Sequence, residues 1–177
     1  MRRMLTLLAG FAACGGTGLH SAIGSGGTAC SPLRLDAGSG WSEKTGQHSA
    51  TFVVTNASRR RCTFDGYPRV VLLDRHGRVL HFTYHHGGDQ MITARPPHRV
   101  VVEPGGRVYF AINKYRCDVR YTALATAIRV QLPGSSTWLR LDAPAAPVLD
   151  FCGPAAPSGI VSISPVVASL PGAAAGP

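Results

Sequence analysis

The chain has 177 residues and a formal net charge of +9, with 18 Lys and Arg against only 9 Asp and Glu. The few acidic residues are scattered, so a catalytic carboxylate pair would have to be assembled by the fold alone. Because the common motifs of serine hydrolases, nucleotide-binding loops and zinc peptidases are also absent, the chain is predicted not to be an enzyme, with a cell-envelope hydrolase as one alternative.

The N-terminus has the layout of an export signal. Two arginines precede an apolar run over residues 4–13, and this run is too short to span a bilayer. Small residues directly before Cys14 resemble a bacterial lipobox, in which the cysteine is acylated and becomes the new N-terminus. Phe11 departs from the aliphatic residue usual at its position, so an ordinary signal peptide is the alternative. We expect residues 1–13 to be removed and Cys14 to carry a lipid.

Glycine and serine are frequent in residues 14–29, and this segment is predicted to be a flexible tether with a root-mean-square reach of about 20 Å. The other terminus, 166–177, is rich in Ala, Gly and Pro and is predicted to be a disordered tail. Between them, residues 30–165 are long enough for one domain with a single hydrophobic core.

This domain has strand signals and almost no helix signal, apart from a turn of helix that Tyr121 to Ala127 could form. Bulky apolar residues alternate with others in 51–55 and 108–112, and glycine-containing turns such as 104–106 separate the segments. The predicted strands are 31–37, 47–56, 69–73, 79–83, 99–103, 107–113, 127–132, 138–141 and 160–164. Short strands at regular spacing, without a longer repeat, predict an all-β, immunoglobulin-like antiparallel β-sandwich.

The domain's four cysteines predict two disulfides. Cys30, Cys62, Cys117 and Cys152 form an even set in an exported chain, and four cysteines permit three connectivities. We favour Cys62 with Cys117 and Cys30 with Cys152, because Cys62 and Cys117 each follow a mid-chain strand where the two sheets should face each other. Four thiolates on zinc are disfavoured because the ligand pairs would lack the short spacings of zinc sites.

Two adjoining motifs carry a family resemblance. Residues 55–58 read T-N-A-S, and residues 62–68 read C-T-F-D-G-Y-P. This pattern resembles the extracytoplasmic family known as domain of unknown function 4232, common in actinobacterial secreted proteins and lipoproteins, which has no settled biochemical activity. The resemblance implies shared folding requirements, and we expect Tyr67 to pack under the corner with its hydroxyl bonded to backbone.

Three histidines are candidates for a metal site. His81, His85 and His86 lie at a strand end that runs into a loop with Asp89 and Met91, and imidazole, carboxylate and thioether groups could hold copper or zinc. The ligand patterns of copper/zinc superoxide dismutases and blue-copper proteins are missing. Exposed polar residues are the simpler interpretation.

The densest basic cluster is Arg59, Arg60 and Arg61. Near a bacterial membrane, such a cluster would be attracted to anionic lipid head groups or wall phosphates, whereas a solvated corner between two strands is the simpler interpretation.

We therefore expect an exported monomer without a cofactor, either lipid-anchored on the outer face of the cell membrane or secreted, that presents a surface to its surroundings. The expected partners are the membrane surface and an anionic envelope polymer or a protein, but not nucleic acid, from which export removes the chain. A copper- or zinc-binding lipoprotein is the other alternative.

Overall fold

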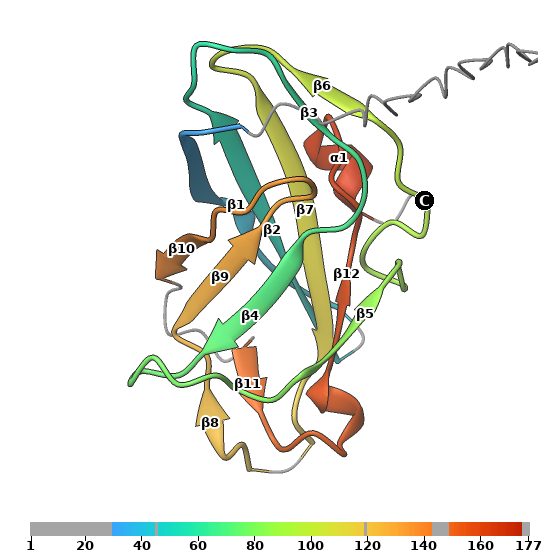
Figure 1. Cartoon of the computed structure of the whole chain (residues 1–177). Coiled ribbons are helices and arrows are strands. Elements are labelled where there is room, and N and C mark those ends of the chain that lie inside the picture. Colours follow the sequence, from blue (N-terminus) through green and yellow to red (C-terminus); the bar gives the residue numbers. More distant parts are fainter. Residues whose placement is uncertain (1–29, 45, 119, 143–148, 175–177) are drawn as a thin grey trace, which may run out of the picture.

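The computed structural model describes residues 30–44, 46–118, 120–142 and 149–174, and nearly all their regular structure is β-strand (Figure 1). The strands are β1 (Leu33–Lys44), β2 (Gln47–Asn56), β3 (Cys62–Phe64), β4 (Arg69–Leu73), β5 (Thr83–His86), β6 (Val100–Val102), β7 (Arg107–Tyr115), β8 (Ala123–Leu124), β9 (Ala127–Gln131), β10 (Leu139–Asp142), β11 (Asp150–Phe151) and β12 (Ile160–Ile163). Two short helical elements, η2 (Pro157–Gly159) and α1 (Leu170–Ala173), lie near the C-terminus. Among the described residues, no helix has the length and apolar character needed to cross a membrane. The all-β prediction is confirmed, whereas the signal peptide, Cys14 and the tether lie outside the described residues.

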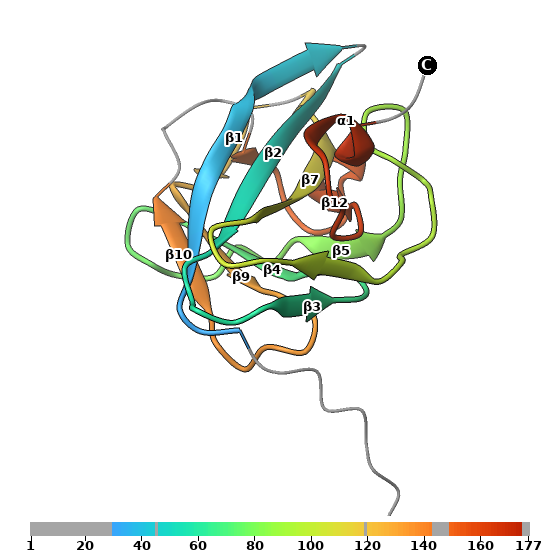
Figure 2. The ribbon, with the colours of Figure 1, turned by 90° about the horizontal axis from the view of Figure 1, so that it is seen from above.

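Two sheets form the layers of the sandwich. One has the strand order β1-β2-β7-β12-β5 and the other the order β10-β9-β4. Figure 2 shows β1, β2 and β7 on one side and β10, β9 and β4 on the other. The short pairs β3–β6 and β11–β8 lie at opposite ends (Figure 1). Most neighbouring strands are antiparallel, but β5 runs parallel to β12, and an immunoglobulin-like topology stays a prediction.

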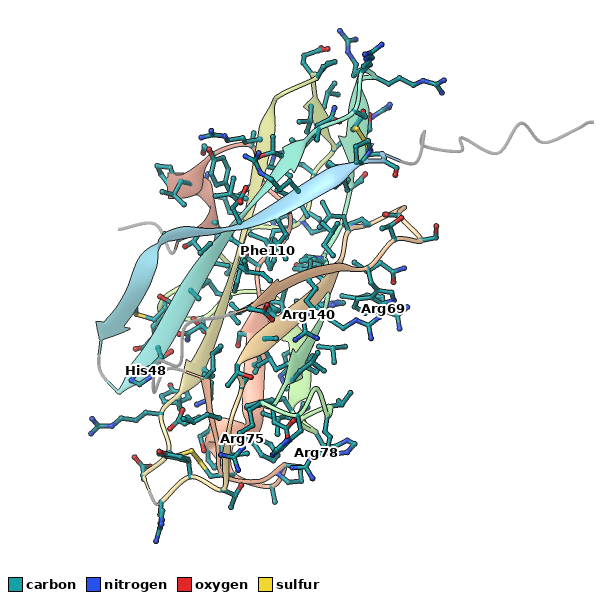
Figure 3. All side chains as sticks on the ribbon, turned by 90° about the vertical axis from the view of Figure 1, so that its left-hand side faces the viewer. His48, Arg69, Arg75, Arg78, Phe110 and Arg140 are labelled. Atoms are coloured by element: carbon teal, nitrogen blue, oxygen red, sulfur yellow. A yellow bond between two sulfur atoms is a disulfide. The ribbon has the colours of Figure 1, made fainter. Side chains whose placement is uncertain are left out.

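Apolar side chains at alternate positions of the strands point inward and form the core between the two sheets. Phe110 of β7 and Phe52 of β2 are each 1% exposed, and their rings stack with centroids 5.0 Å apart. Figure 3 shows Phe110 in the middle of the sandwich. The opposite sheet contributes Val70, Leu72, Ile128 and Val130 to the same cluster. Burial of one such side chain contributes roughly 1.5–3 kcal/mol, so this two-sided apolar surface holds the sheets together.

The C-terminal segment covers the outer face of β7. Val167 and Ala173 are buried in a second apolar cluster with Ala111. The main chain of Val167 exchanges two hydrogen bonds with Tyr109, at 2.9 and 2.8 Å. The prediction of a disordered tail is therefore wrong for residues 166–174, because small side chains let the segment pack closely against the sheet.

The disulfides join Cys30 to Cys62 and Cys117 to Cys152, with Cα atoms 5.6 and 6.0 Å apart. The predicted pairing of Cys62 with Cys117 and of Cys30 with Cys152 is wrong. Cys62 pairs across β3–β6 with Val102, just before β7 begins, whereas Cys117 follows the other end of β7. A strand of 9 residues separates the two ends by about 30 Å, far beyond the reach of a disulfide. Each disulfide therefore joins two segments at one end of the sandwich, Cys30–Cys62 at the β3–β6 end and Cys117–Cys152 at the β8–β11 end.

The corner after β3 differs in detail from the prediction. Gly66 has a φ of +122°, which explains why a glycine occupies this position. Tyr67 stacks on His86 with ring centroids 4.6 Å apart. A tyrosine hydroxyl that bonds to backbone is found instead at Tyr84, which accepts a hydrogen bond from the Leu72 N–H at 3.0 Å.

Two predicted segments fold differently. Residues 121–127 contain the short strand β8, paired with β11, rather than a helical turn. The strand expected at 79–83 begins only at Thr83, because the preceding residues loop back so that the Leu80 N–H bonds to the Leu72 carbonyl.

Candidate functional site

A hydrogen-bonded turn between β2 and β3 presents residues 59–61, called here the arginine corner. The buried Asn56 donates through Nδ2 to the main-chain oxygens of Arg60 at 2.7 Å and Val102 at 3.2 Å. Its Oδ1 accepts from the Ser58 N–H at 3.0 Å. The Asn and Ser of the T-N-x-S motif therefore hold the backbone that presents the three arginines.

The arginine corner carries excess positive charge beside a cavity of about 220 Å³. All three arginines are exposed. The cavity is lined by Cys30, Ser31, Ser58, Arg59, Arg60, Arg61 and Cys62. The Arg61 guanidinium lies 2.6 Å from the Glu103 carboxylate, while Arg59 and Arg60 form no ion pair with any residue that the structure describes. The predicted anion-contact residues are thus grouped in one place, with two cations in excess.

The Cys30–Cys62 disulfide connects this corner to the beginning of the domain. Cys30 directly follows the segment 14–29 in the chain, and Cys62 directly follows Arg61. The arginine corner therefore lies beside the point where segment 14–29 joins the domain.

The three candidate histidines are exposed. His85 and His86 are successive residues of β5, so their side chains point to opposite faces. His81 precedes the strand. The nearby Asp89 is already engaged, because its carboxylate accepts hydrogen bonds from the Asn113 side chain at 2.7 Å and the Met91 N–H at 2.9 Å.

Within the described part of the chain, one group of side chains is close enough to hold a metal: Cys117, Asp150 and Cys152. The two sulfurs are joined in a disulfide, which leaves no thiolate to act as a ligand. His81, His85 and His86 are not part of any such group among the described residues.

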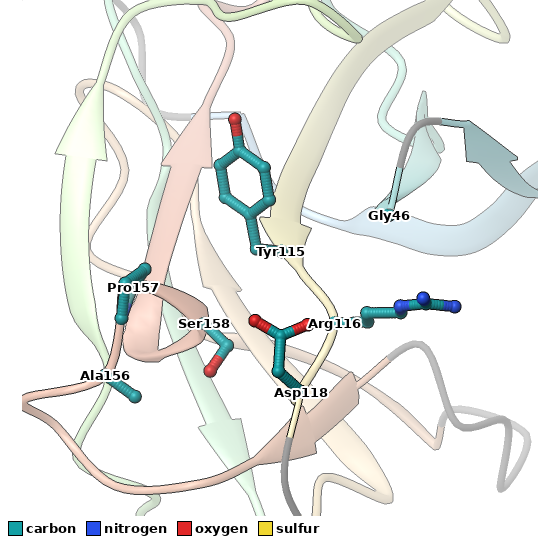
Figure 4. Close-up of a pocket in the computed structure, with 7 residues that line it drawn as sticks. All are labelled: Gly46, Tyr115, Arg116, Asp118, Ala156, Pro157 and Ser158. Atoms are coloured by element: carbon teal, nitrogen blue, oxygen red, sulfur yellow. The ribbon is translucent and has the colours of Figure 1, made fainter.

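A larger pocket of about 530 Å³ lies at the opposite end, beyond β7 (Figure 4). Its lining comprises Gly46, Tyr115, Arg116, Asp118, Ala156, Pro157 and Ser158. In Figure 4 the side chains of Asp118 and Ser158 extend into the space beside η2, and Arg116 points away from Ser158. The described residues of this lining offer hydroxyl and charged groups but no histidine to activate a nucleophile. Sequence reasoning missed the pocket because three separate segments form it.

The family model "Domain of unknown function (DUF4232)" matches residues 30–161, most of the chain. The chain belongs to this family. The resemblance carried by the T-N-x-S and C-x-x-x-G-Y-P motifs is thereby confirmed. No curated protein and no solved structure matches the chain. The two disulfides of this DUF4232 domain indicate an oxidising, extracytoplasmic compartment.

A buried ion pair closes the pocket end of the DUF4232 domain. The Lys114 ammonium donates to the Asp150 carboxylate and to the Tyr115 carbonyl, and the Cys117 N–H donates to the same carboxylate at 2.8 Å. Burial lowers the pKa of Lys114, and Asp150 partly offsets that effect. Because these groups satisfy one another, the pair is a structural clamp between β7 and β11.

Proposed function

We propose that this DUF4232 domain is a non-enzymatic binding module of the cell envelope, tethered by a lipid on Cys14, whose arginine corner contacts the anionic membrane surface. The observation that carries the proposal is the position of the corner. The residue where the tether joins the domain, Cys30, is disulfide-bonded to Cys62 and lines the same cavity as the three arginines. A tether of residues 14–29 would then keep the corner near the surface to which Cys14 is anchored.

The free energy of this contact can be estimated from the number of unpaired basic residues. Each basic residue close to an anionic leaflet contributes about 1 kcal/mol, and the attraction falls off within a Debye length of about 8–10 Å. Two arginines in excess of the Arg61–Glu103 pair would therefore add about 2 kcal/mol. The Asn56 hydrogen bonds hold the main chain of the turn in place, so little backbone conformational entropy would be lost on contact.

Vesicle sedimentation tests the contact separately from the lipid. The protein carrying Cys14→Ser, which cannot be acylated, is mixed with vesicles that contain phosphatidylglycerol or only phosphatidylcholine. We expect binding to the anionic vesicles alone, with a loss of at least tenfold in the double variant Arg59→Ser/Arg60→Ser.

The matched control is Arg75→Ser/Arg120→Ser, which removes the same charge from exposed arginines in the turns after β4 and β7, at the other end (Figure 1). This control should retain binding within about twofold. Equal losses in the two double variants would mean that only net charge matters, and the arginine corner would not be the contact. Mass spectrometry of the mature protein tests the anchor, because an unmodified N-terminus beyond Cys14 contradicts it.

A further inference from the structure

The outer face of the β10-β9-β4 sheet gathers three arginines. Arg129 of β9 lies directly opposite Arg140 of β10, and Arg69 of β4 lies opposite Gln131. Because Gln131 is two residues after Arg129, all four side chains are on one face of the sheet. Their strand neighbours are buried in the core or, beside Arg140, half-buried against it, so this face points outward. Figure 3 shows Arg69 and Arg140 on this sheet.

The ring of Trp138 contacts two of these arginines, Arg69 and Arg129. The guanidinium carbon of Arg129 lies 4.9 Å from the centroid of the Trp138 ring, and that of Arg69 lies 5.6 Å from it. Both distances are within the range of a cation–π contact. Arg69 is held further by a hydrogen bond to the Gln131 side chain at 3.2 Å. Both guanidinium groups are therefore held against the Trp138 ring.

The charge of this arginine face, defined as Arg69, Arg129, Arg140 and Trp138, is not balanced. Arg140 pairs with Asp142 at 3.0 Å, whereas Arg69 and Arg129 form no ion pair with any described residue. Like charges placed directly opposite on neighbouring strands destabilise a sheet. An anion bound between them would offset that repulsion, so the face is complementary to a negatively charged partner.

We propose that the arginine face binds a linear acidic polysaccharide. Guanidinium groups match carboxylates through paired hydrogen bonds, and the partly exposed Trp138 ring adds apolar surface beside them that a sugar ring can contact. The three arginines occupy cross-strand and diagonal positions, where Cβ atoms lie about 5 Å and 7 Å apart, so several cations are spread over the face, which suits a polymer that carries repeated charges rather than one small ion. The face lies on the β10-β9-β4 sheet, whereas the arginine corner precedes β3 at the end of the sandwich, so this proposal is independent of the proposed membrane contact (Figure 1).

Calorimetric titration of the Cys14→Ser protein tests the proposal, with polygalacturonate as the acidic probe and dextran as the neutral one. We expect polygalacturonate to bind and dextran not to bind. Arg129→Gln and Arg69→Gln should each weaken polygalacturonate binding at least fivefold. Arg120→Gln, which removes an exposed arginine outside the face, should change it less than twofold. Unchanged affinity in Arg129→Gln, absent binding of polygalacturonate, or equally tight binding of inorganic polyphosphate would overturn the proposal.

Two substitutions of Trp138 test its positioning role. Trp138→Phe keeps an aromatic face for the guanidinium groups, whereas Trp138→Leu keeps an apolar side chain without one. We expect Trp138→Leu to lose as much affinity for polygalacturonate as Arg129→Gln, and Trp138→Phe to retain most of it, at similar melting temperatures. Equal affinities of the two variants would overturn this role. Vesicle binding by all these variants should stay at the level of the Cys14→Ser parent, so failure here is distinguishable from failure of the membrane contact.

Discussion

The two ends of the sandwich use charge in opposite ways. At one end the three exposed arginines of the corner meet a single carboxylate, that of Glu103, so most of the charge faces solvent. At the other end the Lys114 ammonium is 2% exposed and its charge is neutralised by Asp150. Exposed, unpaired charge is available to a partner but adds little to stability, whereas buried, paired charge acts on the fold. Variants at the two ends should therefore differ both in size of effect and in the property affected.

The largest expected effect on stability comes from Asp150→Ala. The substitution leaves Lys114 buried without its carboxylate and the Cys117 N–H without its acceptor. Removing one partner of a buried pair typically costs 3–5 kcal/mol, so we expect a loss of about 4 kcal/mol in the free energy of unfolding. Urea unfolding followed by circular dichroism measures it.

The matched control is the double variant Lys114→Met/Asp150→Leu. Replacing both charges by apolar groups of similar size is often neutral or stabilising, so this variant should recover the part of the lost stability that comes from the unpaired Lys114 charge, while the Cys117 N–H stays without its acceptor. If the double variant were as unstable as Asp150→Ala, the ion pair would contribute more to the free energy of unfolding than the cost of burying its two charges.

The disulfides come next. They span 32 and 35 residues, so loop-closure entropy predicts almost equal contributions. Replacing either cysteine pair by alanine should cost about 2–4 kcal/mol, measured by the same urea titration.

The two bridges should differ in their coupling to the ion pair. The Cys117 main chain donates to Asp150, whereas Cys30 and Cys62 lie at the far end. Loss of Cys117–Cys152 should therefore be non-additive with Lys114→Met/Asp150→Leu, and loss of Cys30–Cys62 should be additive with it. Coupling of similar size at both bridges would contradict the separation of the two ends.

The sequence allowed the long strands to be predicted because alternation of period two survives over many residues. In β7 the expected segment 107–113 is extended by only two residues. The short strands β3, β8 and β11 span two or three residues, too few to show a period. Their pairing depends on distant partners.

The other features that could not be predicted from the sequence involve residues that only the folded chain brings together. Each cysteine found its partner at its own end of the sandwich, and nothing in the spacing between cysteines reveals which loops share an end. Among the residues proposed to bind a partner, Arg59–Arg61 could be named from the sequence because they are adjacent in the chain. Arg69, Arg129 and Trp138 could not, since strand pairing alone brings together residues that lie far apart in the chain.

A smaller, pH-dependent effect is expected at Asp74, at the end away from the arginine corner. Burial alone would raise the pKa of this carboxyl, but hydrogen bonds from Arg78 and the His76 N–H, with the charge of Arg78, lower it from 3.8 to about 2. A carboxyl whose pKa is depressed by folding contributes stability above its unfolded pKa and loses it as the pH falls through the folded value. Asp74→Asn should therefore lower the melting temperature at pH 7, and the difference should shrink between about pH 4 and pH 2.

Melting curves measured across that pH range check the Asp74 prediction, with Asp65→Asn as an exposed control. A constant difference between Asp74→Asn and the parent protein down to pH 2 would mean that the carboxylate charge plays no part in holding the turn.

The smallest effect on stability is expected from Glu103→Gln, and it sharpens the contrast between the ends most directly. The Arg61–Glu103 pair is more than half exposed on both sides, so its loss should change the free energy of unfolding by less than about 1 kcal/mol. The same substitution removes the carboxylate paired with Arg61 and raises the excess charge of the arginine corner by one. Binding of the Cys14→Ser protein to phosphatidylglycerol vesicles should therefore tighten by about two- to fivefold, up to the roughly 1 kcal/mol expected for one charge near an anionic surface. If binding instead weakens while stability is unchanged, Glu103 must position Arg61 for the contact, and excess charge alone does not determine how this end of the molecule binds.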